Sequence, residues 1–288
     1  MNKLPRPAFD DAAALRELAD NDGVGSYPHL KPWVPAIVAG YGQYKAVAGN
    51  ALEVVEVPLD PEIETFLKGH YGSPPKVIAH ITGIRKKHRQ RVCPMCGSMH
   101  SGTLDHVLPK DDYAAFAVFS LNLVPACECN NKRGKTTVGA APGARVLHPY
   151  FDDCLSERLI AGRFEDLGLI PRITLRILLD DADPHYEAVK FHVAEIVGST
   201  AILEYLSDNW TNLCELPEQV VRGLGEIPAS VEGLQATLSR ELELLDMHHK
   251  GKNNWNSVFV RGLLDPDVTQ WLFDRLTAVD RPADGSLV

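Results

Sequence analysis

Two short cysteine pairs constrain the fold of this 288-residue chain more than any other feature. Cys93 and Cys96 form a CPMC segment, and Cys127 and Cys129 form a CEC segment, with 30 residues between the pairs. That gap is long enough for the chain to fold back and bring four thiolates to one ion, a common ligand set for structural Zn²⁺. The pattern therefore predicts a structural zinc site. Two pairs of reduced thiols in an apolar core are the alternative, because free cysteines are often buried.

Composition restricts the class of protein. Hydrophobic residues make up 45% of the chain and charged residues 23%, which is typical of globular proteins and argues against a disordered or fibrous chain. The segment MNKLPRPAF has no apolar core, and the uncharged stretch 113–127 is shorter than the ~20 residues that span a bilayer. We therefore expect a soluble, cytoplasmic protein without a membrane segment.

Charge is distributed unevenly along the chain. The net charge is −9, but residues 76–145 contain 11 Lys and Arg against 4 Asp and Glu, a local charge of +7, and the rest carries −16. A polyanion such as DNA is therefore expected to bind the middle of the chain. The acidic remainder is a poor surface for DNA and favours a protein partner.

The pattern of apolar residues and helix caps predicts an α+β fold in three regions: a helical region at 1–75, a central module at 76–150 and a mainly helical α+β region at 151–288. ITLRILL at 173–179 alternates like a strand, and the segment 91–105, broken by Pro and Gly, favours a hairpin. Helices are expected at 61–72, from 76 into the basic run, and at 154–160, 185–207, 230–249 and 266–278.

The segments between and after the cysteine pairs contain the residue types that phosphodiester chemistry needs. TLDHVLPK at 103–110 places Asp105 and His106 on an expected strand, SLNLVPAC at 120–127 contains Asn122, and CNNKRGK at 129–135 places Asn130 beside basic residues. Together they offer an oxygen ligand, a base, an orienting amide and phosphate contacts. With one Mg²⁺-like ion these groups would suffice to hydrolyse a phosphodiester bond.

In the order CPMCG, LDHVLPK, NLVPAC and CNNKRGK, residues 93–135 resemble the HNH endonucleases, the zinc-stapled ββα-metal type. The resemblance implies a central zinc-stapled HNH module in a mostly helical chain. RVLHPYFDD at 145–153 also resembles a subset of HNH proteins found in bacteria and their mobile elements. The zinc would stabilise the module and take no part in the reaction.

The resemblance implies a role for each polar residue of the motif. His106 would be the general base, and Asp105 would be a ligand of a catalytic Mg²⁺ or Mn²⁺. Asn122 would orient His106 or the loop around it, and Asn130 would complete the metal site. Asn131 is the competitor of Asn130, because the short CEC spacing leaves the register of the following helix open by one residue.

Basic residues in and before this module are the expected contacts with DNA phosphates, although each could equally be part of a solvated surface. The run IRKKHRQR at 84–91 would add affinity for the backbone of DNA that does not depend on its sequence. The predicted contacts are Arg85, Lys86, Lys87, Arg89, Lys110, Lys132, Arg133 and Lys135.

These features favour a metal-dependent DNA endonuclease of the HNH class, acting in phage defence or in a mobile element. The chain has no GxxxxGK[ST] phosphate loop, so an ATPase that worked with it would be another chain. A zinc-stapled nucleic-acid- or protein-binding module without catalysis is the main alternative, and a structural subunit is a third. The sequence leaves open the cut site, DNA against RNA, the number of strands cut and the oligomeric state.

Overall fold

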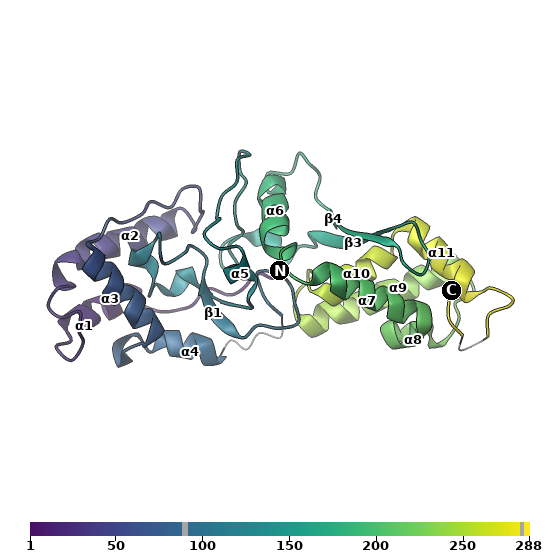
Figure 1. Ribbon diagram of the computed structural model, residues 1–288, viewed down its shortest axis with the longest axis horizontal. Coiled ribbons are helices and arrows are strands. Elements are labelled where there is room, and N and C mark those ends of the chain that lie inside the picture. Colours follow the sequence, from purple (N-terminus) through teal and green to yellow (C-terminus); the bar gives the residue numbers. More distant parts are fainter. Residues whose placement is uncertain (88–91, 283–284) are drawn as a thin grey trace.

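The computed structural model describes residues 1–87, 92–282 and 285–288, and its chain is mostly helical with two small antiparallel sheets (Figure 1). The predicted α+β class is confirmed at this level. In the described part of the chain, no helix is both long enough and apolar enough to cross a membrane. The expected division at residues 75 and 150 stays a prediction.

Helices occupy both ends of the elongated molecule, and the shorter α5 and α6 lie between them (Figure 1). The end that is purple to blue contains α1 (Asp11–Asp20), α2 (Val34–Ala46), α3 (Pro61–Gly72) and α4 (His80–Lys87). The middle contains α5 (Cys129–Lys132) and α6 (Tyr186–His192). The green to yellow end contains α7 (Ile202–Glu215), α8 (Pro217–Val220), α9 (Val231–His249), α10 (Trp255–Leu263) and α11 (Pro266–Leu276).

Shorter turns connect these helices. They comprise the 3₁₀ turns η1 (Lys31–Trp33), η2 (Lys76–Ile78), η3 (Ala114–Phe116), η4 (Ser120–Asn122), η5 (Asp153–Ser156) and η7 (Arg222–Gly225), and a π turn at Val193–Val197.

Several helices begin where their caps predict. Helices α3 and α11 both start at a proline that follows an aspartate, because proline fits the first helical position, where no N–H partner is needed. Ser230 caps α9 by accepting from the N–H of Gly233, and Lys250 ends that helix in the left-handed region at φ +54°. The predicted helices at 61–72, 230–249 and 266–278 are confirmed to within two residues.

The first sheet pairs two strands that the sequence analysis did not connect. Strand β1 (Thr103–His106) runs antiparallel to β2 (Leu123–Ala126), with Thr103 opposite Ala126 and His106 opposite Leu123. The predicted hairpin within 91–105 is therefore wrong. The Pro and Gly that suggested it form a turn at the first cysteine pair, and the strand finds its partner after a long loop.

The second sheet corrects another expectation. Strand β3 (Ile160–Glu165) pairs with β4 (Arg172–Ile177), so the predicted strand at 173–179 is confirmed and the predicted helix at 154–160 is wrong. The apolar residues of 154–160 are divided between two elements: Leu155 belongs to η5, whereas Ile160 starts a strand that packs against α10. Short apolar runs of this kind fit a strand and a helix equally well, so tertiary packing decides which of the two they form.

Aromatic side chains from α2 fix the loop that joins β1 to β2. Tyr41 stacks on Phe119 with ring centroids 4.2 Å apart, and Tyr44 contacts Phe116 and Phe119 at 5.2 Å each. All four rings are at most 2% exposed. This loop therefore belongs to the core, although it contains no regular strand or α-helix.

A buried carboxylate ties α1 to the same loop. Asp11 is 5% exposed, and its two oxygens accept hydrogen bonds from the N–H (2.8 Å) and hydroxyl (2.7 Å) of Ser120. Burial raises the pKa of Asp11 to about 6. Its carboxyl therefore binds a proton more readily in the folded chain than in the unfolded chain, and this contribution to stability is present at low pH and lost as the pH rises through about 6.

We expect the free energies of unfolding of wild type and Asp11→Asn to diverge with pH. Between pH 6.5 and 4.5 the difference should move in favour of the wild type, by at most about 1.4 kcal/mol per pH unit. Denaturant titrations at several pH values measure it. The control Ala13→Ser changes an exposed residue of the same helix that has no titratable side chain, so its difference should stay constant. A constant difference for Asp11→Asn would contradict the prediction.

Candidate functional site

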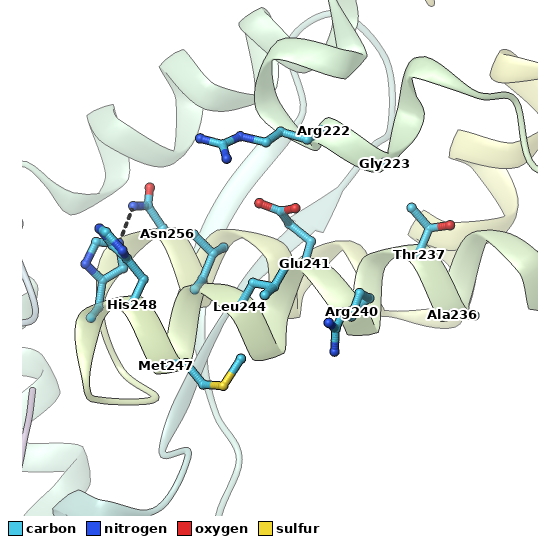
Figure 2. A pocket seen from close by; sticks show the side chains of 12 residues that line it. Arg222, Gly223, Ala236, Thr237, Arg240, Glu241, Leu244, Met247, His248 and Asn256 are labelled. Atoms are coloured by element: carbon cyan, nitrogen blue, oxygen red, sulfur yellow. Dashed lines mark hydrogen bonds between the residues drawn. The ribbon is translucent and has the colours of Figure 1, made fainter.

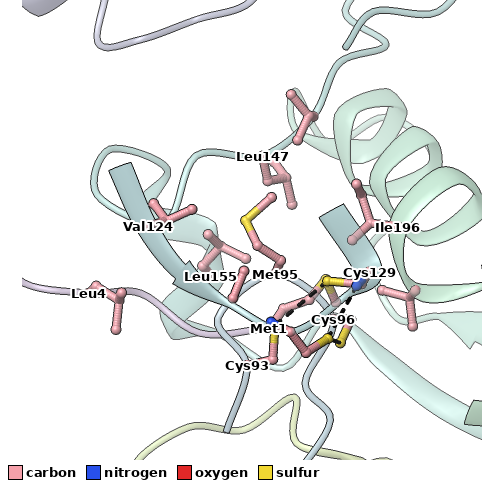
Figure 3. Close-up of a cluster of buried hydrophobic side chains, with 14 of the residues drawn as sticks. Met1, Leu4, Cys93, Met95, Cys96, Val124, Cys129, Leu147, Leu155 and Ile196 are labelled. Atoms are coloured by element: carbon pink, nitrogen blue, oxygen red, sulfur yellow. Dashed lines mark hydrogen bonds between the residues drawn. The ribbon is translucent and has the colours of Figure 1, made fainter. Parts of the chain in front are cut away.

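The four cysteines of the two pairs meet in one buried cluster near the middle of the molecule (Figure 3). The Sγ atoms of Cys93, Cys96, Cys127 and Cys129 all lie within 4.8 Å of one another. Cys93 and Cys129 are 3.7 Å apart, and Cys96 and Cys127 are 3.4 Å apart. A tetrahedral zinc with Zn–S bonds of ~2.3 Å separates its sulfurs by ~3.8 Å. The cluster could therefore hold a metal such as zinc.

A tight turn positions the first pair. The N–H of Gly97 donates to the carbonyl of Cys93 over 2.9 Å, and Gly97 has a left-handed φ of +81°. A Cβ at this position would lie 2.1 Å from the carbonyl oxygen of Asn253. Both the dihedral angle and the close approach require glycine, so the G of CPMCG has a local structural reason.

The second pair joins β2 to α5. Because β2 ends at Ala126 and α5 begins at Cys129, the CEC spacing spans the junction of strand and helix, with Glu128 exposed. The N–H of Cys127 approaches Cys93 Sγ and the N–H of Cys129 approaches Cys127 Sγ, both at 3.4 Å. Such N–H donors favour the thiolate form that binds metal.

The thiols shift one another's pKa values in opposite directions. Burial raises the pKa of Cys93, whereas hydrogen bonds from Cys129 and the other thiols lower the pKa of Cys127. Four thiolates this close repel one another strongly, and a divalent cation removes that repulsion. The donor set therefore fits a metal better than it fits four independent thiols.

Distant parts of the chain bind the carbonyl groups of the first turn. His192 donates from Nε2 to the carbonyl of Met95 over 2.6 Å, and Trp255 donates from its indole to Cys96 over 3.0 Å. The N–H of Trp255 also reaches the carbonyl of Gly97 at 3.1 Å. The cluster is thus the place where the C-terminal region packs on the central segment.

Asp105, His106 and Asn130 converge a short distance along the same elements. Asp105 and His106 end β1, and Asn130 is the second residue of α5. Asn130 donates from Nδ2 to the carbonyl of His106 over 2.7 Å, and Asp105 Oδ1 lies 3.8 Å from His106 Nδ1. They line a cleft of about 190 Å³ together with Pro109, Lys110, Asp111, Asn131, Arg133, Gly134 and Lys135.

One contact fixes the proton of the His106 ring. His106 Nε2 lies 2.9 Å from the carbonyl oxygen of Ala117, which can only accept a hydrogen bond. Nε2 therefore carries the proton in the neutral ring, and Nδ1 has the free electron pair. The ring itself is buried, with His106 only 3% exposed.

Two buried oxygens of residues that line the same cleft lack partners. Within the described residues, Asp105 Oδ2 and Asn130 Oδ1 are buried and form no hydrogen bond. Burial alone would raise the pKa of Asp105, but the adjoining groups of His106 and Asn130 outweigh it and hold that pKa below its usual value. An ionised carboxylate and an amide oxygen, both unpartnered, form a donor set for a hard divalent cation.

Asn122 is fully hydrogen-bonded, unlike Asn130. Its Oδ1 accepts from the N–H of Leu108 at 2.8 Å, and its Nδ2 donates to the carbonyls of Leu108 at 3.0 Å and Phe116 at 3.3 Å. Its side chain therefore ties together the two ends of the loop after β1. This loop contains the Ala117 carbonyl that binds His106, so Asn122 orients the loop rather than the ring itself.

Arg133 differs from the other predicted phosphate contacts because it is only 6% exposed. Its guanidinium donates to the carbonyls of Val107 at 2.8 Å and of His106 and Thr136 at 3.3 Å. Burial lowers the pKa of Arg133 to about 10. Its role as a phosphate contact stays a prediction, while its contacts show that it supports the end of β1.

The remaining basic residues are distributed around the cleft. Lys110 and Lys135 line it, Lys132 is exposed on α5, and Lys135 forms an ion pair with Asp112. Arg85 is exposed on α4. Lys86 and Lys87 belong to α4, but their side chains and the whole of Arg89 lie outside the described residues.

Tyr71 packs against His106, a contact that the sequence did not predict. The centroid of its ring lies 4.3 Å from that of His106, and its hydroxyl donates to the carbonyl of Leu104. The guanidinium of Arg85 lies over the Tyr71 ring, 4.7 Å from its centroid. No local pattern could reveal the contact, because it joins α3 to β1.

A larger groove of about 1130 Å³ lies far from these residues, along α9 (Figure 2). Its walls mix apolar and charged side chains such as Leu244, Met247, Arg222 and Glu241, and Asn256 is hydrogen-bonded to a histidine at its edge. It holds no carboxylate or thiol cluster able to bind metal among the described residues. Size alone therefore does not identify the chemical site.

Comparisons with known proteins do not assign a family. No protein-family model, no curated protein and no solved structure matches the chain.

We expect purified protein to contain about one zinc per chain and to unfold at lower temperature when a chelator removes it. Cys93→Ser should lose the metal and lower the melting temperature, measured by elemental analysis and thermal unfolding. The matched control is Cys214→Ser, because Cys214 is equally buried but lies outside the cluster. Full metal content in Cys93→Ser would contradict the assignment.

Proposed function

We propose that this chain is a metal-dependent endonuclease of the HNH type that hydrolyses DNA phosphodiester bonds. One observation carries the proposal: Asp105, His106 and Asn130 line one cleft, with an unprotonated Nδ1 on His106 and a buried, unpartnered side-chain oxygen on each of Asp105 and Asn130. A base next to two hard ligands is the arrangement that metal-assisted hydrolysis requires.

His106 accepts the proton of the attacking water at Nδ1. The Ala117 carbonyl holds the Nε2 proton, so the ring presents the same nitrogen throughout the reaction. Once protonated, the ring is a cation beside Asp105, whose Oδ1 lies 3.8 Å away. The carboxylate therefore stabilises the charge that the reaction places on His106.

Asp105 and Asn130 would hold a Mg²⁺ or Mn²⁺ ion through their unpartnered oxygens. When bound, this ion stabilises negative charge on the phosphate and on the departing oxygen. Asn130 suits this role better than Asn131, because it is 4% exposed and its Nδ2 is anchored to the carbonyl of His106. Asn131 is exposed at the rim of the cleft.

The DNA backbone would contact the exposed cations around the cleft. Lys110 and Lys135 lie on its wall, and Lys132 projects from the helix that contains Asn130. These lysines supply charge without base recognition, so binding should weaken steeply as salt increases. A role in phage defence or a mobile element, with a partner ATPase, remains part of this proposal on the sequence resemblance alone.

A zinc-stabilised binding module without catalysis is the second candidate. It is favoured by the burial of His106, since a 3% exposed ring leaves little access for water. Such a module would bind DNA in a salt-dependent manner and cleave nothing.

The decisive experiment incubates supercoiled plasmid with the protein in Mg²⁺ or Mn²⁺, with and without EDTA. His106→Ala should lower the rate of nicking or linearisation roughly 10²- to 10⁴-fold, which is the usual contribution of a general base. His100→Ala is the control, because His100 is an exposed histidine of the same segment outside the cleft. Undiminished cleavage by His106→Ala would refute the mechanism, and metal-independent cleavage would refute the metal site.

A further inference from the structure

The segment 145–152 forms a rigid turn that the proposed chemistry does not explain. Arg145 and Asp152 form two hydrogen bonds of 2.7 and 2.6 Å, and their side chains are 13% and 10% exposed. The N–H of His148 also donates to Asp152 over 2.5 Å. The turn places His148 in the core, where it is 0% exposed.

Hydrogen bonds fix the tautomer of His148. Its Nδ1 accepts from the N–H of Tyr150 at 3.1 Å, so Nδ1 carries no proton. Burial lowers the pKa of His148 to about 3, so the ring is neutral near pH 7 and its proton is on Nε2. The hydroxyl of Tyr44 lies 2.9 Å from Nε2 and is therefore an acceptor in this contact.

The hydroxyl of Tyr44 extends this series of hydrogen bonds to Asn122. Tyr44 Oη lies 3.2 Å from Asn122 Oδ1, an amide oxygen that can only accept. The order of donation is thus from His148 to Tyr44 and from Tyr44 to Asn122. All three side chains are 0% exposed, and the Tyr44 hydroxyl is one of two described donors to Asn122 Oδ1, beside the N–H of Leu108. Loss of this hydroxyl would therefore remove a buried hydrogen bond from both His148 and Asn122.

The backbone at Gly49 packs against the rings of Tyr44 and His148. Gly49 has φ +61°, and a Cβ there would lie 2.6 Å from Cδ2 of His148 and 2.8 Å from Cε1 of Tyr44. The main chain therefore packs directly against both side chains. This close packing holds the hydroxyl of Tyr44 between its donor and its acceptor.

We propose that Tyr44 and His148 are positioning residues for the nuclease site, acting through Asn122 on the loop that holds His106. Asn122 binds both backbone groups of Leu108 and the carbonyl of Phe116, and the next carbonyl of that loop, Ala117, accepts from the ring of His106. The inference rests on the proposed function and assigns the 145–152 segment to the support of that site.

The test compares two tyrosines of α2. Tyr44→Phe removes the hydroxyl that links His148 to Asn122. Tyr41→Phe removes a buried hydroxyl that has no hydrogen-bond partner in the described structure. Tyr44→Phe should lower kcat for plasmid nicking roughly 10- to 100-fold with DNA affinity unchanged, because it misplaces the base without touching the DNA surface. Tyr41→Phe should keep the wild-type kcat. Equal kcat values for the two variants would overturn the proposal.

A second measurement separates this inference from the proposed activity. Hydrogen exchange by NMR reports on the N–H of Leu108 and the side-chain amide of Asn122 whether or not the protein cleaves DNA. Exchange should be faster in Tyr44→Phe than in wild type and Tyr41→Phe. If the wild type cleaves nothing but exchange responds in this way, the nuclease proposal fails and the positioning network stands. If exchange is unchanged in Tyr44→Phe, the network itself is refuted.

Discussion

The approach of four thiols to within 4.8 Å is the interaction on which the central structure depends. Four ionised sulfurs at this separation would repel one another, and a metal such as zinc, which the cluster could hold, would neutralise them. Cys127 directly follows the last residue of β2 and Cys129 starts α5, so the cluster sets where the helix lies relative to the sheet. The place of Asn130 beside β1 follows from that, because it is the residue after Cys129.

Short-range patterns predicted the parts of this structure that local chemistry decides. The spacing of the cysteines indicated a common cluster, and proline after aspartate marked the starts of α3 and α11. The pairing of β1 with β2 was not predictable in the same way, because strand register depends on contacts between segments far apart in sequence. The helix predicted at 154–160 was wrong for a related reason: the apolar residues of this segment suit a helix, but pairing with β4 makes Ile160 the start of a strand.

In the candidate site too, the sequence predicted the residues of the local motif but not the contacts that depend on tertiary packing. The sequence resemblance named Asp105, His106, Asn122 and Asn130, and the structure brings three of them to one cleft and places the fourth under the loop. The sequence did not indicate that Arg133 is buried against backbone carbonyls, because a run of basic residues is usually exposed to solvent. The contacts of Tyr71, Tyr44 and His148 were equally hidden, because each joins elements that are distant in the chain.

The size of the sheet explains why such distant support is needed. Strands β1 and β2 have four residues each, and a two-stranded sheet of this length has little stability of its own. The ring of His106, at the end of β1, keeps one orientation only if neighbouring elements hold it. The cysteine cluster constrains the α5 side, while α2 and the 145–152 turn constrain the loop side through Asn122. Groups held in advance need not reorganise as charge develops, which is the main way in which polar sites lower a reaction barrier. Burying these polar groups costs desolvation, which their mutual hydrogen bonds offset, and the proposed result is a fixed direction of the His106 ring.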